Sequence, residues 1–436
     1  MSNKPVKGLR VGNYRITPLG LCTLAVLVLA IAAAIIIPVF HPFDTADRTV
    51  VAINATLAPI AQPAEEDSED EEGPVVTPTP SPTPEPQLRV ATIRSLGEIA
   101  MQQNLLYSVV DGNEFNFFEM FSEIAPVMAD ADYTVADVEG TLGGTVSTSG
   151  SNAMNTPPSL IGTLQDCGVD MLMLANDHAL DGGFQELQAT VQNCVDAGMG
   201  YVGAALSAEE KAQPKIVSIN GIKVAFLAYT ETLNGNEKKA DAAATDYGVN
   251  LISKSNAVTD ITAAREAGAD IVVCYVSWGE MLNQKITESQ QKIAKVLNKA
   301  GVDVIVGYNP HLVQPASWLE STDSDGTVHR TLCLGATGNF LSDSRSQYSD
   351  SGVIFQFTIE ETEFGKFAIT SPVYIPTYVW RSGEEGGKYT YRTLAVGQWL
   401  EDQPEDMAYS DVQRMRQVWA EIQNIMGTEV ATVAAE

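Results

Sequence analysis

The sequence predicts an α/β fold that follows a membrane anchor and a stalk, and three observations lead to this prediction. From residue 88 onward, apolar runs typical of strands alternate with amphipathic segments typical of helices. Residues 270–276 are almost continuously apolar, as expected of a strand buried on both faces in a largely parallel or mixed sheet. Polar residues come directly after several of these runs, at the strand ends where α/β proteins bind ligands.

The composition sets the broad class of the protein. The chain has 436 residues, of which 45% are hydrophobic, so it can form one large domain with extensions. Its formal net charge of −29 argues against nucleic acid as a partner, because binding phosphates requires a basic surface. The five cysteines show no short spacing typical of a metal site, and the sequence leaves open whether Cys167 and Cys194 form a disulfide.

The first forty residues predict a transmembrane anchor. Residues 16–43 contain no Asp, Glu, Lys or Arg, and the apolar stretch within them is long enough to cross the hydrocarbon core of a bilayer as a helix. Four basic residues precede it, so we expect residues 1–15 in the cytoplasm, residues 16–40 in the cytoplasmic membrane and the rest outside the cell. A cleaved signal peptide is the alternative, although its apolar core is usually shorter.

Residues 41–88 predict an extracellular stalk. Residues 65–72 are almost entirely acidic and stay in solvent, and prolines then occupy every second position from 78 to 86. This spacing favours an extended polyproline II conformation. The stalk would hold the following domain away from the membrane.

Local signals place the elements of the outer domain. A proline pair at the first turn, a Thr287/Gln290 capping box, and glycines after the last turns mark helix ends. We expect strands at residues 88–93, 169–175, 198–202, 222–229, 270–276 and 302–306, and helices at 156–164, 184–195, 287–301 and 410–426. We place the main domain at 89–378 and a C-terminal extension with an amphipathic helix at 379–436.

Polar clusters at the predicted strand ends indicate a candidate site. Each cluster alone is compatible with a turn or a helix cap, but side chains at several strand ends can converge in one crevice. The N and O donors of the sequence Asn-Asp-His after the second predicted strand resemble half of a metal site. The clusters are residues 97–98, 137–140, 176–178, 277–280 and 307–311.

Residues 88–374 resemble the CapA-like capsule and poly-γ-glutamate biosynthesis proteins, which belong to the calcineurin-like metallophosphoesterase superfamily. The most specific segments are residues 176–183, 278–280, 307–315, 334–335 and 338–340. The resemblance implies a four-layer α/β/β/α sandwich of metallophosphoesterase type with a metal crevice at the strand ends. It also implies attachment to the outer face of the cytoplasmic membrane, as in Gram-positive members, and work with polymer-synthase membrane proteins on an anionic polymer.

The resemblance also implies the site residues. His178 and His311 are the expected catalytic residues. The metal-ligand positions are Glu98, Glu139, Asn176, His178 and His311. Further residues expected at the pocket are Asp177, Asp181, Ser277, Trp278, Glu280, Tyr308, Asn309 and Asn339.

Departures from the family pattern weaken the expected metal site. Ser277, Tyr308 and Asn309 stand where the family has histidines, and Glu98 stands where it has Asp. A two-metal hydrolase needs several imidazole and carboxylate ligands, and Tyr and Ser are poor ligands for divalent transition metals. We therefore expect a depleted site that binds one divalent ion, Mn²⁺, Mg²⁺ or Ca²⁺, or none.

Three functions remain open at this point. The first is a membrane-anchored protein that assists synthesis or export of an anionic capsule polymer without efficient hydrolysis. The second is a metal-dependent hydrolase of phosphoester or amide bonds at the cell surface. The third is a surface module that binds a ligand, so the sequence leaves undecided whether the protein is an enzyme.

Overall fold

A computed structural model describes most of the chain beyond the predicted stalk. The described residues are 9–11, 14–16, 87–112, 114–144, 154–239, 246–322, 324–383, 388–401, 403, 407–428 and 430–434. The chain divides into two compact units, Met1–Pro82 and Thr83–Glu436. In the first unit, β1 (Leu9–Val11) pairs antiparallel with β2 (Tyr14–Ile16).

The predicted anchor at 16–40 and stalk at 41–88 lie almost wholly outside the described residues. Within the described part of the chain, no helix has the length and apolar character needed to cross a bilayer.

The second unit contains a nine-stranded mixed sheet. Its strand order is β18-β17-β16-β3-β6-β7-β8, with β15 beside β3 and β19 beside β17. Strands β3, β6, β7 and β8 are parallel, whereas β16, β17 and β18 add to them in antiparallel fashion. The bounds are β3 (Val90–Ile99), β6 (Tyr133–Val138), β7 (Met171–Met173), β8 (Gly200–Val202), β15 (Asn339–Leu341), β16 (Ser351–Glu363), β17 (Lys366–Ser382), β18 (Thr390–Ala395) and β19 (Ala431–Thr432).

A six-stranded mixed sheet has the order β13-β14-β12-β11-β10-β9. Its four inner strands are parallel, and the edge strands β9 and β13 are antiparallel to their neighbours. The bounds are β9 (Lys215–Ile219), β10 (Ile222–Thr230), β11 (Ile271–Ser277), β12 (Val304–Tyr308), β13 (Val313–Thr322) and β14 (Val328–Thr337). A short pair, β4 (Val110–Asp111) and β5 (Glu114–Phe115), lies apart from both sheets.

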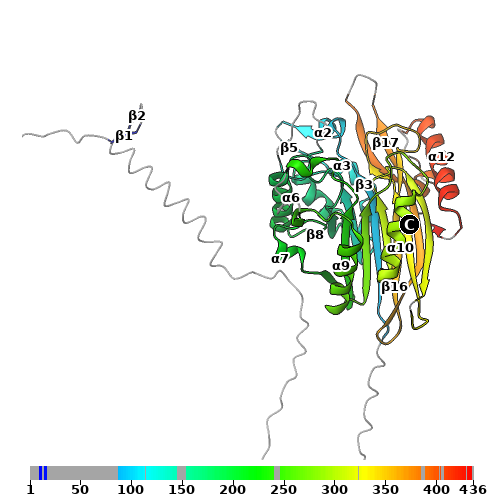
Figure 1. The fold of residues 1–436 in the computed structure, drawn as a ribbon. Coiled ribbons are helices and arrows are strands. Elements are labelled where there is room, and N and C mark those ends of the chain that lie inside the picture. The colour runs from blue at the N-terminus through cyan, green and yellow to red at the C-terminus, as the bar shows by residue number, and fades with distance from the viewer. Residues whose placement is uncertain are drawn as a thin grey trace, which may run out of the picture. The chain divides into compact units, whose positions relative to one another are not determined.

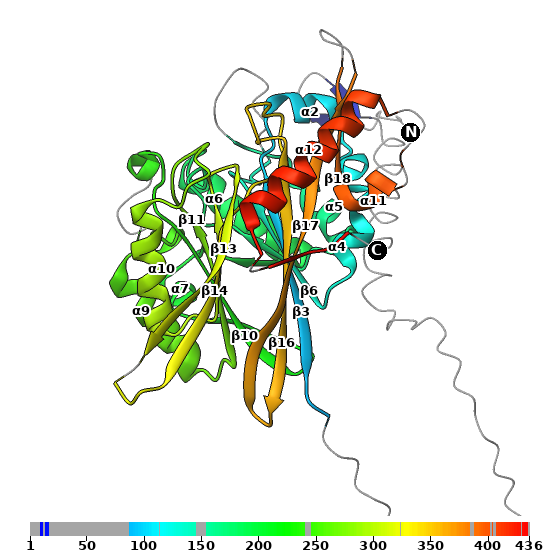
Figure 2. The same ribbon diagram turned by 90° about the vertical axis from the view of Figure 1, so that its right-hand side faces the viewer.

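The mixed α/β fold is confirmed, and helices pack on the outer faces of both sheets (Figure 1; Figure 2). Apolar residues of α9 and α10 form one core with the outward faces of β10, β11 and β12. The Thr287/Gln290 capping box is confirmed at the start of α10, because each side chain bonds the other residue's backbone N–H. The helices are α2 (Gln103–Val109), α3 (Phe118–Phe121), α4 (Ala125–Ala129), α5 (Ser159–Asp166), α6 (Phe184–Ala197), α7 (Ala208–Lys211), η1 (Asn236–Lys239), α9 (Lys254–Glu266), α10 (Glu288–Ala300), α11 (Val396–Glu401) and α12 (Tyr409–Met426).

Aromatic rings fill the space between the two sheets. Phe226 on β10 lies 5.3 Å from the ring of Tyr133 on β6, and 6.4 Å from that of Tyr275 on β11. The Tyr275 hydroxyl lies 3.2 Å from Ser95 Oγ on β3, so a polar contact also joins the sheets. Aromatic pairs at these distances contribute about 0.5–1.5 kcal/mol each beyond their burial. This packing fixes the parallel strand ends of one sheet against those of the other.

Residues beyond 378 belong to the same compact unit. Strand β17 runs through residue 378, and β18 extends the sheet beside it. Helix α12 contacts both β13 and β17 and so lies across the two sheets, as its red ribbon in Figure 2 indicates. Cys167 and Cys194 are both free and buried, so the disulfide left open by the sequence does not form in the structure.

Candidate functional site

The predicted polar clusters come together where the two sheets meet. Glu98 lies near the end of β3, Glu139 follows β6, and His178 lies in the loop after β7. His311 follows β12 of the six-stranded sheet, yet its backbone N–H donates to Glu98 Oε1 over 3.2 Å. The site is therefore built by strand ends of both sheets.

Glu139 is the centre of this cluster. Its Oε1 atom lies 3.5 Å from Nε2 of His178 and 3.5 Å from Nε2 of His311. All three side chains are buried or nearly so. One carboxylate oxygen thus faces an imidazole nitrogen from each sheet.

A neighbouring carboxylate orients His178. Asp181 Oδ2 lies 2.7 Å from Nδ1 of His178, and Asp181 also accepts a 3.0 Å hydrogen bond from the Met154 backbone N–H. In the neutral ring, a proton on Nδ1 shared with Asp181 would leave the Nε2 lone pair facing Glu139 and Asp177. Asp177 Oδ2 lies 3.8 Å from that Nε2 atom.

Glu139, Asp177 and His178 form a group that could hold a metal ion, because one ligand atom from each lies within 4.8 Å of the others. Carboxylate and imidazole donors suit Mn²⁺, and the oxygen-rich set also suits Mg²⁺ or Ca²⁺. Asp137 is a further buried carboxyl group near these ligands. It is buried beside Glu98, its β-pairing partner, and its Oδ1 has no hydrogen-bond partner among the described residues. Several buried carboxyl groups close together are costly to ionise without a positive partner, so this arrangement favours a bound cation.

His311 is held from its other side. Its Nδ1 atom lies 3.1 Å from Glu98 Oε2 and 3.1 Å from Asn339 Oδ1. The Asn339 amide in turn donates to the Ser349 carbonyl over 2.8 Å. His311 has a φ of 57°, which costs most residues of order 1–3 kcal/mol, so these contacts hold the backbone there as well as the ring.

The side-chain carbonyl oxygen of Asn176, a predicted metal ligand, accepts hydrogen bonds from the backbone N–H groups of Gly140 and His178, at 3.1 and 3.2 Å. Its amide donates to the Val138 carbonyl over 3.0 Å. Asn176 thus ties the loop after β6 to the loop after β7.

Three residues that stand where the resemblance implies histidines, Ser277, Tyr308 and Asn309, belong to the walls of the site. Ser277 is the buried last residue of β11. The hydroxyl of Tyr308 donates to the Leu96 carbonyl over 3.2 Å, between the sheets. The amide of Asn309 lies 3.2 Å from two carbonyl oxygens of the 278–279 turn. The side chains of Tyr308 and Asn309 are therefore bonded to the protein's own backbone.

Trp278 and Glu280 are the two remaining predicted pocket residues. Within the described part of the chain, the hydrogen bonds of their side chains go to residues outside the cluster. Trp278 is buried and its indole N–H donates to the Gly335 carbonyl over 2.8 Å. Glu280 accepts from the Asn283 amide over 3.1 Å in a surface turn.

Burial and mutual charge shift the protonation of the acidic residues. Burial raises the pKa of Glu98 to about 7, although the positive charge of His311 opposes the shift. Burial, together with the charge of Glu98, raises the pKa of Asp137 well above its usual range. Burial likewise raises the pKa of Glu139, with the two imidazoles opposing it. The metal-free cluster therefore retains protons at neutral pH.

The pKa values of the two histidines are raised, although burial alone would lower them. Burial lowers the pKa of His178, but the hydrogen bond to Asp181 and the charge of Glu139 outweigh this and raise it to about 9. Burial also lowers the pKa of His311, and the charges of Glu98 and Glu139 raise it to about 9. Protons on these groups would be released when a cation binds.

Two asparagines that the sequence pattern did not single out contact the site. Asn234 Nδ2 donates to Asp177 Oδ2 over 2.7 Å, and Asn236 Nδ2 donates to Asp181 Oδ1 over 2.9 Å. Both lie after β10 in the sequence Leu-Asn-Gly-Asn, which includes the turn signal Asn-Gly. A polar turn after a predicted strand was the signal that could have identified them. Asp137 lay within a predicted cluster but was not proposed as a site residue.

The chain is similar in sequence to a described protein family and to two curated proteins. Residues 92–344 match the family model described as "Bacterial capsule synthesis protein PGA_cap". The chain is 24% identical over 257 residues to the PGA biosynthesis protein CapA of Bacillus subtilis (strain 168), covering 58% of this chain and 64% of that protein. It is 22% identical over 275 residues to the capsule biosynthesis protein CapA of Bacillus anthracis, covering 62% and 64%. The chain thus aligns with less than two thirds of each relative's length.

Two solved structures are similar at lower identity. The NAD nucleotidase NadN of Haemophilus influenzae matches with a TM-score of 0.43 and 11% identity, over 80% of this chain and 65% of that chain. The calcineurin-like phosphoesterase YfkN of Bacillus subtilis matches with a TM-score of 0.42 and 12% identity, over 78% and 99%.

Proposed function

This chain belongs to the bacterial capsule synthesis protein family PGA_cap, and we propose that it assists the synthesis or export of an anionic capsule polymer such as poly-γ-glutamate. The observation that carries the proposal is the convergence of Glu98, Glu139 and His178 with His311, all within the residues that match the family. A family match without this cluster would support only a shared scaffold.

We propose that the cluster holds one divalent ion through Glu139, Asp177 and His178. Support comes from the spacing of their ligand atoms and from the further buried carboxyl groups around them, Glu98 and Asp137. A bound ion would supply Lewis-acid polarisation of a substrate oxygen. Tyr308 and Asn309 are committed to backbone carbonyls, which supports a site with fewer ligands than a two-metal hydrolase requires.

The proposed polymer and this chain are both negatively charged. A net charge of −29 opposes direct contact with a free polyanion. The acidic segment 65–72 contributes part of this charge outside the family-matched residues. We therefore propose that polymer contact uses bridging cations or passes through polymer-synthase membrane proteins.

We also propose that the chain is anchored in the cytoplasmic membrane through residues 16–40, with the main domain outside the cell. The support is the sequence alone: a long uncharged apolar stretch that basic residues precede.

The experiment that tests the proposed function combines metal content with polymer yield. The purified full chain is exposed in turn to Mn²⁺, Mg²⁺ and Ca²⁺, and the bound ion is measured after the excess is removed. Full-length wild type and His178→Ala are then expressed in a polymer-producing bacterium that lacks its own family member. We expect one ion per chain and restored polymer in wild type, and loss of both in His178→Ala.

His329→Ala is the matched control, because His329 lies on β14 and bonds the Val302 carbonyl, a contact within the six-stranded sheet. Normal polymer yield with His178→Ala would refute a role for the cluster in capsule formation. Absence of any bound ion would refute the metal part of the proposal and leave the family role to be tested through partner proteins.

A metal-dependent hydrolase is the second candidate, and the His178–Asp181 pair favours it. Asp181 lies 2.7 Å from Nδ1 of His178 and can keep a proton on that nitrogen. Nε2 is then available to exchange a proton with a reacting group, as a general acid or base does. Turnover of an activated phosphodiester that falls by orders of magnitude in both His178→Ala and Glu98→Ala would establish it. Lost polymer without any measurable turnover would favour the assembly role.

A further inference from the structure

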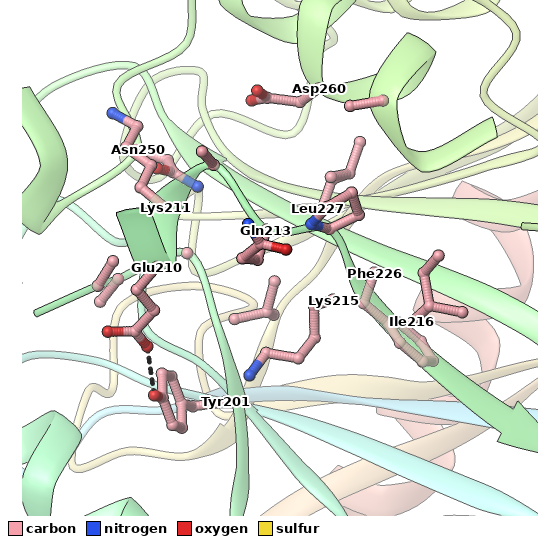
Figure 3. A pocket seen from close by; sticks show the side chains of 17 residues that line it. Tyr201, Glu210, Lys211, Gln213, Lys215, Ile216, Phe226, Leu227, Asn250 and Asp260 are labelled. Atoms are coloured by element: carbon pink, nitrogen blue, oxygen red, sulfur yellow. Dashed lines mark hydrogen bonds between the residues drawn. The ribbon is translucent and has the colours of Figure 1, made fainter. Parts of the chain in front are cut away.

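A pocket of about 210 Å³ lies at the edges of both sheets, away from the cluster around Glu139, and Figure 3 shows the side chains that line it. Lysines and the carboxylates of Glu210 and Asp260 both line it, so its charged groups are of both signs. These carboxylates accept hydrogen bonds from tyrosine hydroxyls and hold no part of the cluster. A different carboxylate outside the cluster, that of Glu231, is connected to it.

Glu231 joins three segments of the chain at the edge of the site. It directly follows β10, and its Oε2 accepts from the Gly279 backbone N–H over 2.8 Å. Its Oε1 accepts from the hydroxyl of Ser289 in the first turn of α10. Its own backbone N–H donates to the Ser277 carbonyl over 2.9 Å. One residue therefore fixes the turn at 278–279 against the loop after β10 and against α10.

The turn at 278–279 supports the loop that follows β12. The side-chain amide of Asn309 lies 3.2 Å from each of the two carbonyl oxygens of this turn. Just beyond the turn, the Leu282 backbone N–H donates to the Pro310 carbonyl over 2.9 Å. The loop is thus held on both residues that directly precede His311.

These contacts hold a strained backbone. Asn309 has a φ of 89° and His311 a φ of 57°, both in the left-handed region that favours glycine. Such conformations are unfavourable for other residues and persist only where the surrounding contacts determine them. A loop with two strained residues relaxes when such contacts are removed, so the place of His311 depends on the turn that Glu231 fixes.

The loop that begins with Glu231 also reaches the other half of the cluster. Later in the same loop, Asn234 and Asn236 donate to the carboxylates of Asp177 and Asp181. Glu231 therefore lies where the supports of both histidines meet.

We propose that Glu231 is a positioning residue of the site, which keeps His311 facing Glu139 by holding Gly279 and, through the turn, Asn309. The proposal rests on the proposed function only in that it takes this cluster as the working site. Glu231 acts through the backbone, since its bonds in the described part of the chain go to the segments around the site.

Two variants separate the geometry of Glu231 from its charge. Glu231→Gln keeps an oxygen for the Gly279 N–H and gains an amide that the Ser289 hydroxyl can accept, whereas Glu231→Ala loses both bonds. Both variants are neutral, so a difference between them reports the hydrogen bonds. The first measurement is the NMR signal of the His311 imidazole in the metal-free full chain. We expect Glu231→Ala to displace it and Glu231→Gln to leave it close to wild type, with the signal of His329 on β14 unchanged in both.

The second measurement is the affinity of the full chain for Mn²⁺. It should fall roughly 10- to 100-fold in Glu231→Ala, as when a residue that orients a metal ligand is removed, and stay near wild type in Glu231→Gln. Glu288→Ala is the matched control, because Glu288 is an exposed carboxylate of the same helix turn as Ser289 and pairs with Lys292 over 3.6 Å. It should change neither measurement. If wild type binds no Mn²⁺, the metal part of the proposed function fails, and the His311 signal alone decides the positioning role.

The proposal is overturned if the His311 signal of Glu231→Ala equals that of wild type, or if Glu231→Gln displaces the signal as much as Glu231→Ala does. If Glu231→Ala does not fold, Glu231→Asp replaces it, because the shorter side chain draws the carboxylate away from Gly279 and Ser289. A displaced His311 signal in Glu231→Asp supports the proposal, and an unchanged one overturns it.

Discussion

Asn234 donates its side-chain amide to Oδ2 of Asp177 over 2.7 Å, from a loop that follows a strand of the opposite sheet. Asn236, in the same loop, makes the equivalent bond to Asp181 over 2.9 Å. The two amides therefore hold the carboxylates on either side of His178 in the sequence. This loop fixes which lone pairs the cluster presents to a cation.

Replacing Asn234 with Ala should weaken the binding of Mn²⁺ by the full chain roughly 10- to 100-fold, as is typical when a residue that orients a metal ligand is removed. Without the amide, Asp177 loses the bond that fixes its rotamer. The affinity is measured by isothermal titration.

Asn104→Ala is the control for this variant. Asn104 also donates to an aspartate, Asp343, over 2.6 Å, but at an exposed position outside the cluster. An equal loss of Mn²⁺ affinity in both variants, or none in Asn234→Ala, would contradict a specific role for the loop.

Asp181→Asn should lower the pKa of His178 from about 9, because the variant removes a negative charge that is hydrogen-bonded to its Nδ1. The amide oxygen of Asn can still accept a hydrogen bond from Nδ1–H, so the ring keeps its place while its basicity falls. The measurement is an NMR titration of the imidazole in the metal-free chain.

The exposed Asp196 provides a matched variant, Asp196→Asn, which should not move that titration. An unchanged His178 in Asp181→Asn would mean that another carboxylate sets its protonation.

Much of the fold could be predicted because its signals are local. Pro157, Gly198 and the Thr287/Gln290 box mark element ends that depend on a few neighbouring residues, and the structure has α5, α6 and α10 close to the predicted bounds. Strand β7 is shorter than the predicted strand at 169–175, because only Met171–Met173 pair on both sides. Apolar character extends beyond the hydrogen-bonded part of a strand, so hydropathy overstates its length.

The candidate site could be predicted only in part, because contacts between sheets leave no local pattern. Glu98, Glu139 and His178 could be found at strand ends. Asn234 lies in a polar turn after a predicted strand, but the turn alone does not reveal its role, which depends on a contact with Asp177, 57 positions away in the sequence.

The stability of the metal-free chain should fall as the pH rises from about 5 to about 9. The folded pKa of Glu98 is raised from 4.5 to about 7, so this residue's contribution is lost between those values as it ionises in the folded state. The folded pKa values of His178 and His311 are raised from 6.5 to about 9, so their contribution is full below 6.5 and lost as the pH passes 9. All three groups lower the free energy of unfolding as the pH rises, because the folded state binds more protons than the unfolded state.

Urea denaturation at several pH values measures this dependence. The general repulsion of an acidic chain also grows with pH, so the informative comparison is with the variant Glu98→Gln/His178→Gln/His311→Gln, whose stability should vary less between pH 5 and pH 9. Identical pH dependence in the two proteins would show that the cluster does not couple protons to folding.

Arg414 connects the C-terminal helix to the loop that supports the site. Its guanidinium bonds both carboxylate oxygens of Asp350, at 2.8 and 2.9 Å, and Asp350 follows Ser349, whose carbonyl binds Asn339. Both side chains are mostly buried, so the pair is screened less than a surface ion pair. Arg414→Met should lower the free energy of unfolding by about 1.5–3 kcal/mol, the usual range for a charge-assisted hydrogen bond. Urea denaturation gives the value, with Arg416→Met at an exposed position of the same helix as control. If both variants lose the same stability, the helix is held by its apolar face, and the pair with Asp350 contributes nothing specific.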